Sequence, residues 1–338
     1  MSLYTVDRPM QVNDYHEGLI RSKDSEARFL KLLKDGKQIT NWEGSWAIHA
    51  LAKRRDPTGS EGADKTSGWG KKVPIQVKGQ AQVFESEGWL VTEEAEAMPA
   101  GYDGRTGVEA ARQAVMDGQD LLLSIEGVVL SDQDAVEVDT DVDRRTRGIG
   151  QWLNPTQGSF QPVPATVRPT DAQYYAGTFA NYNEDAFKAQ IKAAYNQVGR
   201  PVTLVGPCGG DLKEKLSMFN FKVPVSASIA DTRAVNSNDG VFRMVVDTFE
   251  YDFGTVRTFL QPGILPDRSD PDEWADSVYT PQSGYFLNMD MWRMQWLLRI
   301  KHYKGLNSGG GKRGFNKGTG RLQCLNPMGQ FMVRPVNS

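Results

Sequence analysis

Cysteine and histidine are scarce in this chain, which has two cysteines and three histidines among its 338 residues. Two cysteines, Cys208 and Cys324, cannot build a disulfide framework, and they indicate reduced thiols in an intracellular protein. The low histidine content argues against a histidine-based metal site or catalytic centre. We therefore expect no metal site, no cofactor and no catalytic residues.

Long hydrophobic runs and an excess of positive charge are also missing. No apolar run approaches the roughly 18–20 residues that span a membrane. Residues 1–19 lack a basic region followed by an apolar stretch, which excludes a secretory signal. The chain has 39 basic and 42 acidic residues, so its overall charge does not indicate nucleic-acid binding over the whole surface. What remains is the composition of a soluble globular protein with about two to three domains.

Residues 41–82 form an unusually long stretch rich in glycine, serine and charge. It carries Trp42, Trp46 and Trp69, and it returns through Val73, Ile75 and Val77, which alternate with polar residues as in a strand. A loop of this length without a core of its own is uncommon in a compact monomer, whereas three tryptophans argue against disorder. Both observations predict an extended arm that packs on another subunit.

Residues 103–131 give the strongest helical signal in the chain. Val108, Val115, Leu122, Ile125 and Val129 follow helical spacing, and charged residues lie mostly between them. The pattern predicts a helix about 40 Å long. Such a helix would be a structural spine of the fold.

The other expected elements are shorter. We expect helices at 25–35, 183–199 and 211–219, strands at 201–206 and 321–333, two strands within 241–262 joined by a turn at 251–254, and a basic glycine-rich loop at 305–320. The helix at 183–199 would be capped by Asn183 or Glu184 and ended by Gly199. Together with 201–219 it predicts a compact α-β-α unit.

The sequence GPCGG at 206–210 has the pattern of a nucleophile elbow, with a strand before it and a helix after it. Asp247 or Asp252 and then His302 could complete a cysteine hydrolase centred on Cys208. Against this reading, Pro207 restricts the residue before it to extended geometry, and one βα unit is fewer than a hydrolase sheet needs. We favour a glycine-rich turn that holds a packed thiol.

Three other patterns resemble ligand-binding motifs but do not meet their requirements. GGGKRG at 309–314 neither follows an expected strand nor opens a helix, and DTDVD at 139–143 lacks the later glycine and glutamate of a calcium loop. Basic clusters at 53–55, 71–72 and 312–313 could contact phosphates. We favour ion pairs with acidic neighbours such as the glutamates of 93–96.

Five stretches carry a resemblance to a known family. They are QAQVFESEGWLVTEEAEAM (80–98), DLLLSIEGVVL (120–130), RTRGIGQWL (145–153), YDFGTVRTFLQP (251–262) and RLQCLNPMGQFMV (321–333). Combined with the Trp-bearing loop and the long helix, they resemble the major capsid protein of tailed bacteriophages, over about residues 40–338. Within the second stretch, Glu126 matches a typical acidic position of that family.

The resemblance implies an α+β protein with the Hong Kong 97-like capsid fold. The implied parts are an N-terminal arm (1–40), an E-loop (41–82), a P-domain with the spine helix (83–150), an A-domain (151–240), and a final segment (241–338) that adds P-domain strands, returns through the A-domain and ends in a closing strand. The chain begins at Met1 without the scaffolding segment that some relatives cleave, so we do not expect proteolytic maturation at this end.

The implied function is self-assembly into pentamers and hexamers of an icosahedral head around double-stranded DNA. The implied place is the virion, after assembly in the host cytoplasm. The partners would be other copies, DNA through non-specific contacts, a cement or scaffolding protein and a portal, but no membrane. The expected inter-subunit residues belong to the E-loop: Trp42, Trp46, Arg54, Arg55, Trp69, Lys71 and Lys72. Two alternatives stay open, an encapsulin-like cellular compartment and the cysteine hydrolase.

Overall fold

The computed structural model describes residues 2–3, 27–49, 73–98, 109–137, 143–158, 160–219, 248–261, 264, 281–305 and 311–335. Of the expected interface residues, Arg54, Arg55, Trp69, Lys71 and Lys72 lie outside these ranges. Trp42 and Trp46 lie within them.

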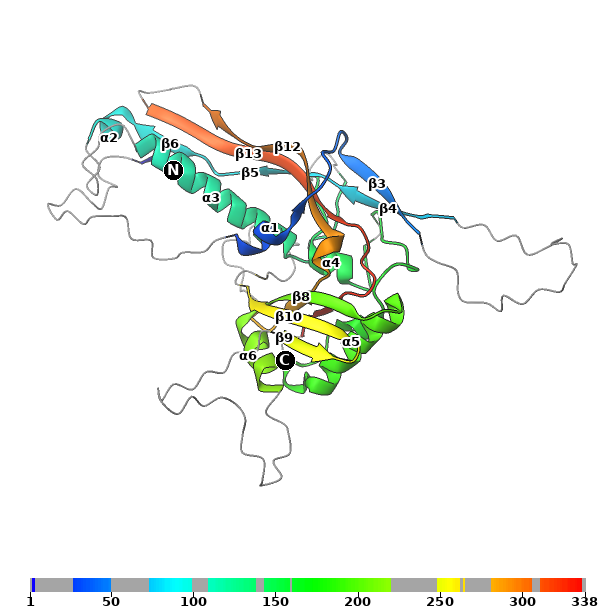
Figure 1. Cartoon of the computed structure of the whole chain (residues 1–338). Coiled ribbons are helices and arrows are strands. Elements are labelled where there is room, and N and C mark those ends of the chain that lie inside the picture. Colours follow the sequence, from blue (N-terminus) through cyan, green and yellow to red (C-terminus); the bar gives the residue numbers. More distant parts are fainter. Residues whose placement is uncertain are drawn as a thin grey trace, which may run out of the picture.

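The first sheet is an elongated sheet in the upper part of Figure 1, with the long helix α3 (Glu109–Val129) along one face. Its strands follow the order β1-β6-β13-β12-β2, and β5 also pairs with β13. The strands are β1 (Ser2–Leu3), β2 (Lys34–Asp35), β5 (Gln82–Glu85), β6 (Trp89–Thr92), β12 (Trp292–Lys304) and β13 (Gly311–Cys324). Two short helices flank it, α1 (Arg28–Leu32) and α2 (Glu93–Ala97).

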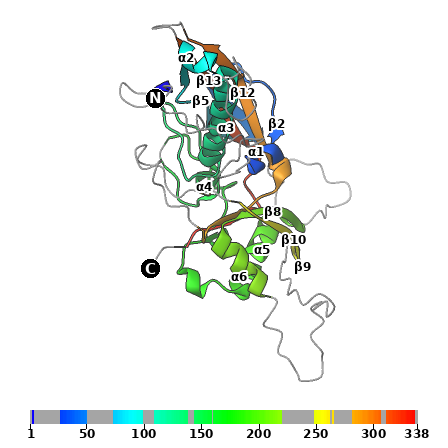
Figure 2. The same ribbon diagram turned by 90° about the vertical axis from the view of Figure 1, so that its left-hand side faces the viewer.

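The second sheet forms a separate body below the first, as Figures 1 and 2 show. Its order is β7-β14-β11-β8-β10-β9. The strands are β7 (Tyr174–Tyr175), β8 (Val202–Cys208), β9 (Thr248–Tyr251), β10 (Gly254–Leu260), β11 (Gly284–Phe286) and β14 (Phe331–Val333). Helices α5 (Glu184–Val198) and α6 (Gly210–Met218) pack on it, and the short helices η2 (Asp171–Gln173) and η3 (Phe179–Asn181) lead into α5.

The described residues form two apolar cores, and the first of them also takes in Tyr285 and Met332 of the second sheet. Phe187 of α5 lies at the centre of the second core, with the rings of Phe286 and Phe331 at 5.4 and 5.9 Å. The first core is built around α3, the sheet and the short helix α4 (Ile149–Leu153), whose Trp152 is fully buried. The chain crosses between the bodies several times, at η6 (Met289–Met291) before β12 and between β13 and β14.

A third element, the two-stranded β3–β4 arm, is part of neither sheet. It consists of β3 (Glu43–Ile48) paired antiparallel with β4 (Ile75–Gln80), with Glu43 opposite Gln80 and Ile48 opposite Ile75. Figure 1 shows this arm extending beyond the end of the first sheet. Residues 50–72, which join its two strands, lie outside the described residues.

Several sequence predictions are confirmed. The spine helix forms at 109–129, and α5 is capped by the Asn183 side chain and ended by Gly199, which has a left-handed φ of +74°. Strands β9 and β10 pair across a turn at 251–254. Within the spine helix, Val115 and Leu122 are exposed, at 60% and 39%.

Three predictions are wrong. The expected loop at 305–320 is largely strand β13, because its glycines let β12 approach closely: a Cβ on Gly320 would lie 2.8 Å from the Trp296 ring. The expected strand at 321–333 is instead the end of β13 and the separate β14, which belong to different sheets. The short helix α1 ends at Leu32 rather than near Gly36, because the chain then joins β12 as β2.

Candidate functional site: the root of the β3–β4 arm

The indole of Trp46 fixes strand β3 to the first core. Its Nε1 donates a hydrogen bond of 3.0 Å to the carbonyl oxygen of Cys324, and its ring lies 5.9 Å from that of Trp152. Both partners are fully buried. An indole with its apolar rings packed and its N–H bonded holds the arm in one direction at its root.

The side chain of Arg321 contacts both strands of the arm. Its Nε donates to Gln295 Oε1 at 2.8 Å and its Nη1 to the carbonyl of Gly79 in β4 at 3.4 Å, while its guanidinium lies 5.8 Å from the Trp46 ring centre. Burial lowers the pKa of Arg321 from its ordinary value. Gly44 makes room for this side chain, since a Cβ there would lie 1.7 Å from the guanidinium.

Trp42 lies just before β3 and closes the root. Its carbonyl accepts a hydrogen bond of 2.9 Å from the backbone of Ala81, and the guanidinium of Arg144 lies 4.7 Å from its ring centre. The structure therefore places the two described tryptophans that the sequence singled out at the root of the arm. It engages both within the chain, and their contact with a neighbouring subunit stays a prediction. Sequence reasoning missed Arg321 and Arg144, which stand far from the arm in the chain and carry no local motif.

A second polar cluster ties the spine helix to two distant segments. Glu126 Oε2 accepts hydrogen bonds from the backbone N–H groups of Phe29 and Leu30 at 2.7 and 3.0 Å, and its Oε1 accepts one from Gln261 at 2.7 Å. Burial raises the pKa of Glu126 above its ordinary value, although these hydrogen bonds act in the opposite direction. One carboxylate thus joins α1, α3 and the end of β10.

In the basic cluster at 312–313, Lys312 forms an ion pair with one of the expected acidic neighbours, Glu96. Lys312 Nζ lies 3.2 Å from Glu96 Oε1, and Glu96 Oε2 accepts a hydrogen bond of 2.9 Å from the first turn of α3 at Ala110. This confirms the ion-pair interpretation for Lys312. The clusters at 53–55 and 71–72 lie outside the described residues.

The thiol of Cys208 is not placed as a nucleophile. Cys208 ends β8 and is fully buried, and burial raises the pKa of its thiol to about 12. The expected partner His302 lies in β12 of the other sheet. A thiol with so high a pKa is protonated at neutral pH, so the geometry agrees with the packed-thiol interpretation.

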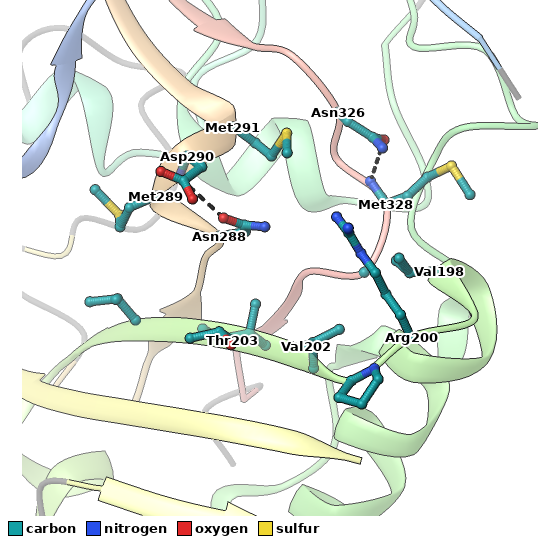
Figure 3. Close-up of a pocket in the computed structure, with 14 residues that line it drawn as sticks. Val198, Arg200, Val202, Thr203, Asn288, Met289, Asp290, Met291, Asn326 and Met328 are labelled. Carbon is teal, nitrogen blue, oxygen red and sulfur yellow. Dashed lines mark hydrogen bonds between the residues drawn. The ribbon is translucent and has the colours of Figure 1, made fainter.

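A cavity of about 390 Å³ lies between the two bodies. Figure 3 shows Arg200 reaching across it from the start of β8 towards Asn326 and Met328. On the other side are Asp290, whose carboxylate pairs with Lys34 at 2.6 Å, and Met289. The lining holds a single carboxylate and neither histidine nor cysteine, so it does not offer an acid–base pair or a thiol nucleophile.

The described ranges hold neither a metal-binding cluster nor a membrane-spanning helix. No three or more His, Cys, Asp or Glu side chains in these ranges are grouped so that they could hold a metal ion. Among the helices of the described part of the chain, none is long and apolar enough to cross a membrane.

The elongated sheet with its spine helix, the second sheet and the projecting arm define a viral shell fold, as comparison with solved structures shows. The capsid chain of cyanophage A-1(L) superposes with a TM-score of 0.62 at 12% identity, covering 99% of this chain and 100% of that one. The capsid of cyanophage P-SCSP1u gives 0.57 at 11% identity, covering 97% and 94%. A chain of Mycobacterium phage Bobi gives 0.54 at 11% identity with both chains fully covered. The expected α+β, Hong Kong 97-like capsid fold is confirmed.

The sequence itself then identifies the family. The family model of the SU10 major capsid protein matches residues 3–332, so the chain belongs to that family. Comparison with curated proteins gives no match. The protein is a structural component of a phage capsid, located in the virion, and the expected role as a major capsid protein is confirmed. The encapsulin-like and hydrolase alternatives are not favoured.

Proposed function

We propose that this protein assembles into pentamers and hexamers that tile an icosahedral head around double-stranded DNA, in the host cytoplasm. The observation that carries the proposal is the β3–β4 arm, which projects beyond both cores and yet is fixed at its root by Trp46 and Arg321. An arm held in one direction suits a repeated heterologous contact with the next subunit. A scaffolding or cement protein and a portal are the further proposed partners, and we propose no catalytic role.

The contact residues proposed for this arm are Arg54, Arg55, Trp69, Lys71 and Lys72, together with the exposed edges of Trp42 and Trp46. Residues 50–72 carry six basic and three acidic side chains, so an acidic surface on the neighbour would suit them. The domain division given above, with an N-terminal arm, E-loop, P-domain and A-domain, is proposed on the same basis. In the structure, β9 and β10 of the final segment join the sheet of the proposed A-domain.

Electron microscopy of the purified, singly expressed protein tests the proposal, with light scattering as a check. We expect closed shells, tubes or capsomer rings. A monomer under all conditions would contradict unaided self-assembly. Nucleic acid within native particles would support a viral head, whereas particles filled with protein cargo would support a cellular compartment.

The arm is tested with the double variant Arg54→Glu/Arg55→Glu. We expect at least a tenfold loss of assembled particles with no change in the folded state of the subunit. Lys192→Glu, an exposed reversal of charge on α5, is the matched control and should assemble normally. If the double variant assembles normally, these two arginines are not contact residues. The role of the protein in the capsid would not be affected by that result.

A further inference from the structure

The cavity between the two bodies is walled by three chain segments, two of which are tied together directly. The segments are residues 198–205 at the start of β8, residues 288–291 around η6, and the turn 326–329. Gln197 Oε1 accepts a hydrogen bond of 2.9 Å from the backbone N–H of Gly329, which packs so closely on Val198 that a Cβ would overlap it. The cavity volume of about 390 Å³ lies within the usual range of small-molecule sites, about 300–1,000 Å³. The cavity is therefore large enough for a ligand and has a fixed wall.

Arg200 is held at the edge of this cavity by the backbone on both sides of it. Gly199 ends α5 with a φ of +74°, and Pro201 restricts the residue before it to extended geometry. Figure 3 shows the Arg200 side chain reaching from the start of β8 into the space between the walls. No residue of the described ranges accepts a hydrogen bond from the guanidinium or pairs with its charge. A permanent positive charge with five N–H donors is thus open to the cavity.

The two asparagines of the lining add further donors. The Oδ1 atoms of Asn288 and Asn326 accept hydrogen bonds of 3.1 and 3.0 Å from the backbone N–H groups of Asp290 and Met328. Their NH₂ groups, which can only donate, have no acceptor among the residues that the structure describes. The one carboxylate of the lining, Asp290, is paired with Lys34 at 2.6 Å. The guanidinium and the asparagine side chains therefore favour a ligand that accepts hydrogen bonds and carries negative charge.

The rest of the lining is largely apolar. Met289, Met291 and Met328 contribute flexible thioether side chains, and Val198 and Val202 add branched aliphatic ones. Methionine side chains adapt to apolar groups of different shape. A small hydrophilic anion such as inorganic phosphate would use the guanidinium and leave this apolar wall in contact with water. A ligand that matches the whole lining has an apolar group as well as a charge.

We propose that the cavity between the two bodies binds a small amphipathic anion, a carboxylate or sulfonate attached to an apolar group. The anionic group lies at Arg200 and the apolar group lies against the three methionines. The site binds its ligand without chemical change. It is separate from the β3–β4 arm, so the proposal goes beyond the proposed assembly and does not depend on it.

A fluorescent amphipathic anion tests the ligand class on the full-length protein. The probe is 8-anilinonaphthalene-1-sulfonate, whose fluorescence rises in apolar surroundings. We expect saturable binding of one probe per chain, and displacement by octanoate at a concentration at least about tenfold lower than is needed for 1-octanol or inorganic phosphate. If 1-octanol displaces the probe as well as octanoate does, the charge is not recognised. If phosphate does so, the apolar wall is not used. Either result, or the absence of saturable binding, would overturn the proposal.

Two variants then locate the binding site. Arg200→Met removes the charge and should raise the Kd for the probe at least about tenfold. Arg313→Met, at an exposed arginine of β13 that does not line the cavity, is the matched control and should leave the Kd unchanged. Thr203→Trp keeps every charge but fills the cavity from an exposed position of β8, and it should abolish binding. Equal Kd values for the two arginine variants, or undiminished binding by Thr203→Trp, in proteins folded by circular dichroism, would overturn the proposal.

Discussion

The carboxylate of Glu126 accepts a hydrogen bond of 2.7 Å from the backbone N–H of Phe29, across 97 residues of sequence. Phe29 is itself fully buried in the first core. A side chain of the spine helix therefore performs the role of a cap for α1, whose preceding residue Ala27 offers no side-chain hydrogen bond. The start of α1 depends on tertiary structure rather than on its own sequence.

Replacement of Glu126 by glutamine should destabilise the subunit by about 1–3 kcal/mol. Glutamine keeps the shape but replaces one of the two acceptor oxygens by an NH₂ group, so either the backbone N–H groups of Phe29 and Leu30 or the side-chain amide of Gln261 loses its acceptor. The measurement is urea unfolding of the unassembled protein, with hydrogen exchange at residues 28–32 as a local readout. Glu94→Gln, on the exposed side of α2, should change stability by less than about 0.5 kcal/mol. Equal effects of both changes would show that Glu126 does not hold α1.

The pH dependence of the Glu126→Gln effect should have a definite sign. Burial raises the pKa of Glu126 in the folded state, so between its ordinary value and this raised value the folded chain binds a proton that the unfolded chain does not. Stability from this group is therefore present at lower pH and falls as pH rises through that window. The stability difference between wild type and variant should be larger below the window than at neutral pH. Unfolding of both proteins at several pH values measures it, and the opposite trend would contradict the assigned shift.

Arg321→Met should loosen the β3–β4 arm. The change removes the donors to Gln295 and Gly79 and should cost about 1–3 kcal/mol, with faster hydrogen exchange in β3 and β4. Arg299→Met is the control, because Arg299 pairs with Asp35 on the surface at 2.8 Å and such pairs contribute about 0–1 kcal/mol. Unchanged exchange in the arm of the Arg321 variant would show that the hydrogen bonds of Arg321 do not fix it.

Local patterns in the sequence predicted elements whose signals are themselves local. The cap at Asn183, the stop at Gly199 and the turn at 251–254 depend on residues close to one another, and all three were predicted correctly. The fold class came from a resemblance spread over most of the chain. These are the parts of the structure for which local preference and tertiary packing agree.

The failures share a physical cause, because they depend on contacts with residues of other elements that the local pattern does not contain. The glycines of 305–320 suggest a loop when read alone, yet in the structure they allow β12 to lie against β13. Likewise, Arg321 reaches Gly79 across 242 residues, and no pattern near the arm indicates it. The helical period predicted that α3 forms. It did not indicate which of the apolar side chains of α3 are buried by other described residues and which are exposed.

Cys208 should resist alkylation in the native protein. Its pKa of about 12 leaves about one thiol in 10⁴ ionised at pH 8, roughly a thousandfold less than for an ordinary cysteine thiol. Iodoacetamide labelling followed by mass spectrometry should modify Cys208 only after unfolding. Cys208→Ala should leave particle assembly intact, and rapid labelling of the native thiol would contradict the buried placement.

Gly320→Ala should destabilise the first sheet although it adds a single methyl group. The new Cβ would lie 2.8 Å from Cε3 of Trp296 and 2.9 Å from the carbonyl oxygen of Gln295. Since Trp296 lies directly opposite in β12, neither atom can move without shifting the strand pair, and overpacking of this kind costs about 1–3 kcal/mol. Gly210→Ala, at the start of α6, meets no atom within 4 Å and should leave stability unchanged or raise it by up to about 1 kcal/mol. Urea unfolding of the two variants side by side measures the difference. If both variants have the same stability change, the close approach of β12 does not require glycine at position 320. The close approach would then not explain why this glycine-rich segment forms a strand.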